Sequence, residues 1–216
     1  MRFNSLVPSM VALVAALAGS ASAAMTFDSF TVAQSETNNL PPLSGVNWAS
    51  PASSQPIFGA SGTRAAFAYN YSGLGSTTTS VSGGTATLTT TSSGGAGAGL
   101  AYSGSAQDLT GYTFSFFLNS NVENDGQIGF SFFLETAGLG TVERMVVYTG
   151  AGTYTVDTSD FADPAIDLTA ITSLGFSIYT ATPGSATVSN FTYTPAPGAL
   201  ALLGAAGLAG ARRRRA

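Results

Sequence analysis

YTFSFFLN (residues 112–119) and IGFSFFLE (128–135) are near-repeats, and their shared pattern decides the fold class. In both segments, large apolar residues occupy every second position, namely Tyr112, Phe114, Phe116 and Leu118 in the first and Ile128, Phe130, Phe132 and Leu134 in the second. Successive side chains of a β-strand point to opposite faces, so each segment predicts a strand with one buried face. The connection SNVENDGQ (120–127) contains the turn signal Asp125-Gly126. We therefore expect a hairpin with an extended loop, whose two apolar faces share one core.

Further segments show the same period of two and predict additional strands. They are residues 27–32, 64–72, 84–91, 142–149, 153–157, 174–180 and 186–193. Clusters of Gly, Ser, Asn and Pro separate them, as in SSGGAGAG (92–99), and the proline-rich stretch 36–56 predicts a long loop. Many short strands separated by turns are typical of all-β folds. We expect a two-sheet antiparallel β-sandwich of the jelly-roll kind.

The composition argues against most enzyme chemistry. The 216 residues include no His, Cys or Lys, so Ser–His–Asp, Cys–His and Ser–Lys sites lack their base or nucleophile. Zinc, copper and haem sites usually need His or Cys ligands as well. A pair of carboxylates, as in glycoside hydrolases, remains chemically open, but no spacing selects such a pair. We expect a protein that is not an enzyme.

The charge balance argues against a nucleic-acid partner. Between the two ends of the chain, residues 24–193 hold two arginines, Arg64 and Arg144, against eleven acidic residues, a net charge of −9. Binding to nucleic acid depends on neutralising phosphates with Lys and Arg. We therefore expect no nucleic-acid binding by this part of the chain.

The beginning of the chain has the composition of a secretory signal. One arginine is followed by an apolar stretch over residues 6–17 and then by small residues. Ala21-Ser22-Ala23 fits the A-x-A cleavage pattern, with Ala21 and Ala23 at the determining positions. We expect a helical signal peptide over residues 1–23, cleaved after Ala23 or, as a second choice, after Ala24.

The end of the chain, PAPGALALLGAAGLAGARRRRA (195–216), predicts a membrane-held segment. As a helix, the apolar run 198–211 would cover about 21 Å at about 1.5 Å per residue, less than the hydrocarbon core of about 30 Å. The arginines at 212–215 would hold its end on the cytoplasmic side. We expect three parts: the signal peptide 1–23, a β-sandwich passenger domain 24–193, and a segment 194–216 with a short transmembrane helix. That segment is either a sorting signal or a plain anchor.

The three elements of the tail resemble the PEP-CTERM sorting segment of bacterial envelope proteins. They are the motif Pro195, Ala196 and Pro197, the apolar run, and the cluster Arg212, Arg213, Arg214 and Arg215. Ala196 stands where the usual motif has Glu. The passenger is also loosely similar to PEP-CTERM passengers, in GTR (62–64) and in two DLT segments (108–110 and 167–169).

The resemblance implies a location, partners and a role. It implies an exported protein of the cell envelope or extracellular matrix, held transiently in the inner membrane by its C-terminal helix. An exosortase-like membrane protease would be the processing partner. The implied role is structural or adhesive and non-catalytic, in a matrix of exopolysaccharide.

A carbohydrate-binding, lectin-like module is the alternative function, with calcium as the one cofactor considered. DTSDFADPAID (157–167) supplies Asp157, Asp160 and Asp163, whose oxygens suit a hard cation. The same segment is equally readable as a solvated acidic loop, with Asp167 bonding its own backbone at a turn. Trp48 is the candidate sugar contact. Phe67, Tyr69 and Tyr71 share one face of a strand, which more often belongs to the core.

Intact-mass spectrometry of the protein from its native host tests the expected organisation. We expect a mass that lacks residues 1–23 and the residues after Pro197, because both ends are predicted processing signals. A mass that retains Arg212 to Arg215 would contradict the sorting prediction and leave the tail as a plain anchor.

Overall fold

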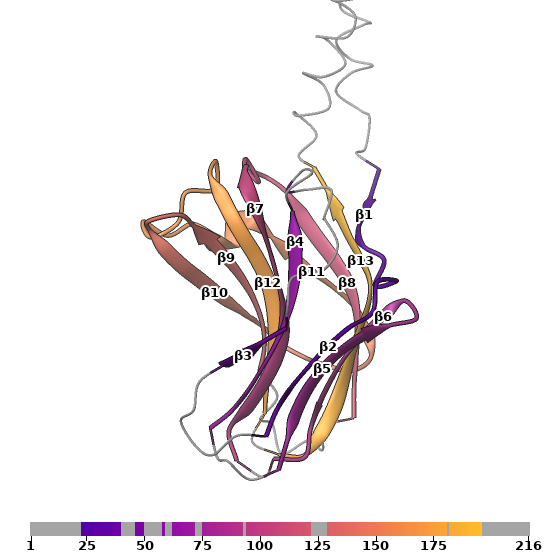
Figure 1. The fold of residues 1–216 in the computed structure, drawn as a ribbon. Helices are drawn as coiled ribbons and strands as arrows, with labels where there is room; N and C mark the ends of the chain where they lie inside the picture. Colours follow the sequence, from indigo (N-terminus) through magenta and orange to yellow (C-terminus); the bar gives the residue numbers. More distant parts are fainter. Residues whose placement is uncertain are drawn as a thin grey trace, which may run out of the picture.

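Two antiparallel β-sheets pack face to face in the computed structural model of the chain (Figure 1), which describes residues 23–39, 46–49, 58, 62–71, 75–92, 94–121, 129–180 and 182–195. The seven-stranded sheet has the order β11 (Gly152–Asp157), β8 (Thr113–Ser120), β13 (Gly184–Thr194), β6 (Thr85–Thr90), β5 (Thr77–Ser82) and β2 (Gln34–Asn38), with β1 (Met25–Asp28) also paired to β13. The six-stranded sheet has the order β10 (Gly140–Val146), β9 (Gly129–Thr136), β12 (Ile171–Thr180), β7 (Ala96–Gln107), β4 (Thr63–Asn70) and β3 (Val46–Trp48). The predicted two-sheet antiparallel sandwich is confirmed.

Helical structure is scarce in the described part of the chain. A short 3-10 helix, η2 (Thr158–Phe161), follows β11. None of the described residues form a helix with the length and apolar character needed to cross a membrane. The expected signal helix, except for Ala23 at its end, and the expected transmembrane helix over 198–211 lie outside the described residues.

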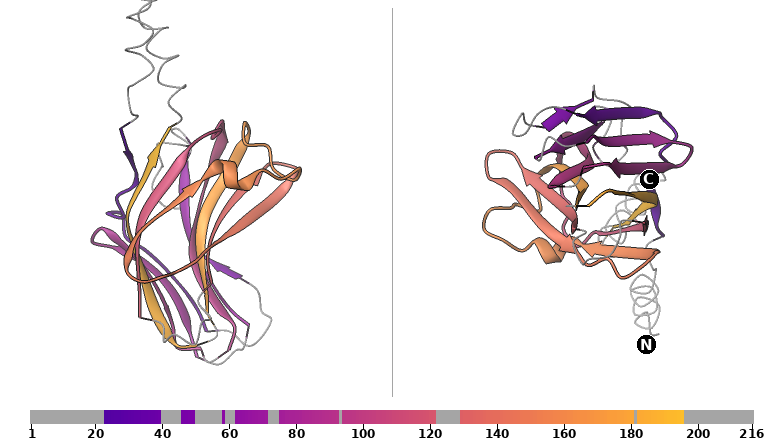
Figure 2. Two further views of the ribbon diagram at one scale, coloured as in Figure 1. Left: turned by 180° about the vertical axis from the view of Figure 1, so that it is seen from behind. Right: turned by 90° about the horizontal axis from the view of Figure 1, so that it is seen from below.

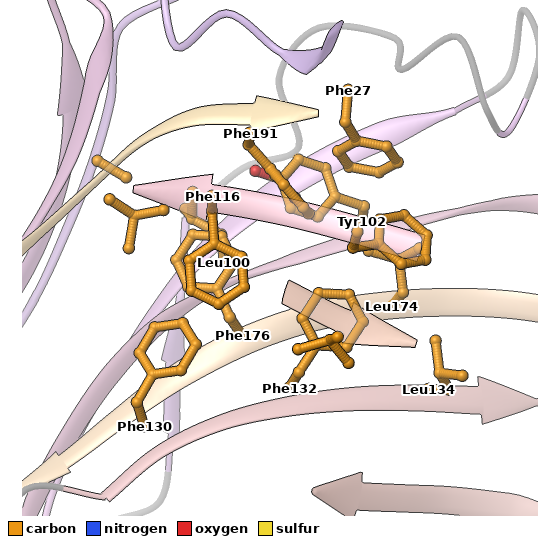
Figure 3. Packing of buried hydrophobic residues seen from close by; sticks show 14 of the residues in the cluster. Phe27, Leu100, Tyr102, Phe116, Phe130, Phe132, Leu134, Leu174, Phe176 and Phe191 are labelled. Atoms are coloured by element: carbon orange, nitrogen blue, oxygen red, sulfur yellow. The ribbon is translucent and has the colours of Figure 1, made fainter. Parts of the chain in front are cut away.

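The two near-repeats that predicted the fold lie in opposite sheets. β8 pairs with β11 and β13, whereas β9 pairs with β10 and β12, so the predicted hairpin is wrong. The predicted shared core is confirmed, since the ring of Phe114 lies 5.2 Å from that of Phe132 and the ring of Phe116 lies 5.0 Å from that of Phe130. Alternation specifies a buried face but not the hydrogen-bonding partner, and here the apolar faces meet across the sandwich (Figure 3).

Phe191 occupies the centre of the core. Six aromatic rings lie with centroids 4.5–6.3 Å from its own, those of Phe27, Tyr102, Phe114, Phe116, Phe132 and Phe176. A bulge in β13 places it there. Before the bulge the even-numbered Val188 faces the core, and after it the odd-numbered Phe191 does, because the bulge inserts one extra residue. Asn190 lies in the bulge and has a φ of 52°, a conformation that Asn tolerates better than most residues.

Strand β7 was missed by the sequence pattern, as were β5, β2 and β3. The predicted turn SSGGAGAG (92–99) contains the start of β7, and β3 lies within the predicted loop 36–56. The inward positions of β7 begin with Ala96 and Ala98 and its outward positions begin with Gly97 and Gly99. Alternation is therefore present, but between residues too small to show it by hydropathy, and glycine is a poor indicator of a strand.

A buried ion pair joins the two sheets. Arg64 of β4 is fully buried, and its Nη1 lies 2.8 Å from Oδ2 of Asp28 on β1. Its Nη2 donates to the carbonyl of Val32 at 2.5 Å, and its Nε donates to Oε1 of Gln34 at 3.1 Å. The guanidinium thus fastens the segment from Asp28 to Gln34 onto the six-stranded sheet.

Asp28 has two further hydrogen-bond donors. The Tyr102 hydroxyl donates to its Oδ2 at 3.0 Å, and the backbone N–H of Phe30 donates to its Oδ1 at 2.7 Å. Phe30 has a φ of 53°, which is strained for a bulky residue, and this short bond holds it there. Burial, and then the charge of Asp28, raise the pKa of Tyr102 well above its ordinary value, so its hydroxyl remains a donor.

Substitution of Arg64 tests this network. We expect Arg64→Met to lower the free energy of unfolding by about 3–5 kcal/mol, because it leaves the Asp28 carboxylate buried without its cation. Adding Asp28→Asn should restore part of the loss, since the amide oxygen still accepts from Phe30. Urea denaturation measures both effects.

Arg144→Met is the matched control. The Arg144 and Asp163 side chains are 38% and 40% exposed and their charged atoms lie 4.0 Å apart, so this change should cost less than about 1 kcal/mol. Equal losses for the Arg64 and Arg144 variants would contradict a special role for the buried pair.

Candidate functional site

The outer face of the six-stranded sheet carries aligned rows of side chains. Along each row, the residues come from β4, β7, β12 and β9 in turn: Tyr69, Gly97, Tyr179 and Gly129; Phe67, Gly99, Ser177 and Ser131; Ala65, Ala101, Gly175 and Phe133; Thr63, Ser103, Ser173 and Glu135. On β10, Met145 pairs with Ser131 and Glu143 pairs with Phe133, which extends two rows. We call this surface, made of these rows with Tyr71, Met145 and Glu143, the aromatic face.

Three aromatic rings lie across the glycines of this face. A Cβ on Gly97 would lie 2.0 Å from Cζ of Tyr69, and a Cβ on Gly99 would lie 2.4 Å from Cζ of Phe67. On the other side of β7, a Cβ on Gly175 would lie 2.4 Å from Cζ of Phe133. Only glycine leaves room for these rings, which therefore cover the neighbouring strands instead of standing away from the sheet.

Three tyrosines gather at one end of the aromatic face. The rings of Tyr69 and Tyr71 lie 5.0 Å apart, and the side chains of Tyr71 and Tyr179 both approach Gly95. Burial raises the pKa of Tyr69 well above its ordinary value, with smaller contributions from Tyr71, Glu143 and Tyr179. Tyr71 is 55% exposed and Tyr179 is 43% exposed, so their rings are available to a ligand.

A line of polar groups runs across the middle of the same face. Ser131 donates to the carboxylate of Glu143 and lies 2.8 Å from the hydroxyl of Ser177. Both serines are buried, whereas Glu143 is exposed. The hydrogen bond from Ser131 therefore fixes the orientation of a carboxylate that solvent and ligands reach.

An open groove of about 570 Å³ lies at the other end of the face. Its lining residues are Ala65, Ala101, Ser103, Gly104, Glu135, Thr172 and Ser173. Small side chains leave the space, while Glu135 and the hydroxyls supply polar atoms. β7 runs beneath it and is curved along its length (Figures 1 and 2). The volume is in the usual range for ligand sites, about 300–1,000 Å³.

The outer face of the seven-stranded sheet is chemically different. Each outward position of β2, β5, β6 and the first half of β13 is Ser or Thr: Ser35, Thr37, Thr78, Ser80, Ser82, Thr85, Thr87, Thr89, Ser185, Thr187 and Ser189. This hydroxyl surface has no ring and no charge among those positions. The aromatic face is therefore the better candidate site.

The prediction that Phe67, Tyr69 and Tyr71 belong to the core is wrong, because all three lie on the aromatic face. The core positions of β4 are instead those of Arg64, Ala66, Ala68 and Asn70. Trp48 lies in β3, where its backbone pairs with that of Phe67 at the edge of the same sheet. Its side chain lies outside the described part of the structure, so its predicted contact with sugar stays a prediction.

The three aspartates predicted to bind calcium do not meet. Asp157 accepts a hydrogen bond from Thr113, and Asp163 accepts one from the N–H of Ala165 at 2.9 Å. The Asp160 carbonyl accepts from Nε of Arg144 at 2.8 Å, which brings a cation to this segment. Within the described ranges, no three acidic side chains are grouped to hold a metal ion.

The predicted turn at Asp167 is confirmed. Its Oδ1 accepts from the backbone N–H of Thr169 at 3.0 Å and from the Thr169 hydroxyl at 2.7 Å, which lowers the pKa of Asp167. Asp108 makes the same backbone bond to Thr110 at 2.9 Å. Both DLT segments are therefore local turns.

The predicted processing residues fall mostly outside the described part of the chain. Ala23 is exposed, and Pro195 is buried directly after β13. Ala21, Ala196, Pro197 and the arginines at 212–215 lie outside the described ranges. Signal cleavage and sorting stay predictions.

Comparison with known proteins gives only distant likenesses. No family model matches the chain, and no curated protein matches it. Among solved structures, it is similar to the family 11 carbohydrate-binding module of the cellulase Lic26A-Cel5E of Clostridium thermocellum, at 15% identity over 82% of this chain and 97% of that one, with a TM-score of 0.43. It is also similar to the family 30 module of the cellulase Cel9D-Cel44B of the same organism, at 17% identity over 51% and 74%, with a TM-score of 0.40. TmCBM61, solved with β-1,4-galactotriose, has 9% identity over 51% and 70% and a TM-score of 0.35. Likeness at this level assigns no ligand to this chain.

Alanine substitutions at the glycines test how the rings are supported. A Cβ on Gly99 or Gly175 would also lie 2.2 Å from a backbone carbonyl, that of Phe176 or Leu100. We expect each of these two variants to lose about 1–3 kcal/mol of stability in urea denaturation, as overpacked sites do.

Gly97→Ala is the matched comparison, because its three nearest atoms belong to the Tyr69 side chain alone. That ring can swing outward, and alanine restores about 0.5–1 kcal/mol of strand preference, so its stability should change little. Equal losses in all three variants would contradict this distinction.

Proposed function

We propose that this protein binds polysaccharide through the aromatic face. The observation that carries the proposal is the combination on one sheet face of exposed tyrosine rings, an oriented carboxylate and an open groove. A pyranose ring has C–H groups on its flat sides, which pack on aromatic rings, and hydroxyls at its rim, which bond to carboxylates and hydroxyls. Tyr71 and Tyr179 supply the first kind of contact, and Glu143 and Glu135 supply the second.

The support beneath the rings favours binding. Tyr69 lies over Gly97 and Phe133 lies over Gly175, so both rings are held by the sheet before any ligand arrives. Glu143 is held by Ser131 in the same way. A site whose side chains are already ordered loses less conformational entropy on binding.

We also propose that this binding serves a protein outside the cytoplasm. The signal-like segment 1–23 and the PEP-CTERM-like tail support export and processing. Polysaccharide binding would then retain the processed protein in the envelope or in an exopolysaccharide matrix, where its role is adhesive. No step of this proposal requires catalysis.

Affinity electrophoresis in gels that contain single polysaccharides, followed by titration calorimetry on the retarding polymer, tests the proposal. We expect Tyr179→Ala and Tyr71→Ala each to weaken binding about tenfold or more, as loss of an aromatic anchor does. Both side chains are exposed, so the fold should survive, and thermal unfolding verifies this.

Phe117→Ala is the control for the loss of an aromatic ring. Phe117 is half-buried and points outward from β8, on the opposite side of the sandwich. Binding by this variant should match that of the unchanged protein. Retardation that is equally insensitive to all three substitutions would place the binding surface elsewhere and refute the proposal.

A further inference from the structure

We propose that the groove accepts glycans that lack acid groups, neutral or amine-bearing, and rejects uronic acid polymers. The inference rests on the proposed function and names the substrate class for the same site. The inference follows from the positions of the few charged side chains in the described chain. Most pyranoses can stack on an aromatic ring, whereas only some polysaccharides carry charged groups, so charge can separate one class of polysaccharide from another.

Neither arginine of the described chain reaches the aromatic face. Arg64 is fully buried between the sheets and paired with Asp28. Arg144 bonds to the Asp160 carbonyl, lies near Asp163, and places its guanidinium 5.7 Å from the ring of Phe161. The sequence contains no Lys or His. The described residues therefore offer no cation to a carboxylate in the groove.

The charged side chains on the aromatic face are both acidic. Glu135 and Glu143 point outward from β9 and β10. Glu143 accepts from Ser131, whereas no hydrogen bond or ion pair to the Glu135 carboxylate is found within the described residues. The two oxygens of the Glu135 carboxylate can therefore accept hydrogen bonds from sugar hydroxyls or from an ammonium group in the groove.

A uronate in this groove would face Glu135 without compensation. Proteins recognise carboxylates chiefly through Arg and Lys, and like charges placed together oppose binding. A bridging calcium ion would remove the conflict, but the described ranges contain no three acidic groups placed to hold one. The same negative charge favours polymers that carry amines.

Matched polymer pairs test the inference, because each pair shares a backbone and differs in acid groups. We would measure hydroxyethylcellulose against carboxymethylcellulose and dextran against carboxymethyl-dextran, with chitosan as the amine-bearing probe. At low ionic strength, we expect the acidic member of a retained pair to bind at least about tenfold more weakly, with a smaller gap at high salt.

Glu135→Gln locates the effect. We expect this variant to reduce the difference in affinity between the neutral and the acidic polymer of a pair. Asp160→Asn makes the same charge change at an exposed site in η2 and should leave that difference in affinity unchanged. Equal binding of both members of a retained pair, or a gap unchanged by Glu135→Gln, would overturn this inference and leave the proposed function standing. Failure to bind any of these polymers and any of the gel panel would overturn the proposed function itself.

Discussion

The buried pair between Arg64 and Asp28 determines which side of β4 faces the core. Side chains of a strand alternate, so a slip of one residue would expose Arg64 and bury Tyr69. It would also leave Asp28 without its cation, and a buried unpaired carboxylate is among the most costly defects in a protein interior. The ion pair thus specifies register. In doing so, it places the rings of β4 on the outer face of the sheet.

Small residues on β7 allow close packing on both sides of the six-stranded sheet. On the inner side, Ala96 and Ala98 are buried and lie near Leu88 and Ala186 of the other sheet. On the outer side, Gly97 and Gly99 leave room for the rings of β4. A central strand with larger residues would separate the sheets and lift the rings from their support. The fold and the candidate site therefore depend on the same strand.

The sequence pattern predicts the strands with large alternating residues and fails where that signal is weak or ambiguous. Phe114, Phe116, Phe130 and Phe132 identify two strands and their buried faces, but pairing depends on contacts that no local pattern contains. For β4, hydropathy selects the face with Phe67 and Tyr69 as the core. That choice is wrong because the true inner face carries a charge that is paired. A lone arginine amid small residues, with an aspartate elsewhere to neutralise it, was the available signal.

Affinity and selectivity have separate physical origins on the aromatic face. In the proposed function, stacking on Tyr71 and Tyr179 uses the flat side of a sugar ring, which most pyranoses offer, so this contact would contribute affinity without selecting a particular glycan. Selectivity needs a feature that differs between glycans, and in our proposal the charge of Glu135 discriminates against glycans that carry acid groups. Arg64 is buried against Asp28 and Arg144 bonds to the Asp160 carbonyl, so neither arginine neutralises the charge of Glu135. In our proposal, the same burial of Arg64 that fixes the register of β4 also withholds its charge from the outer face.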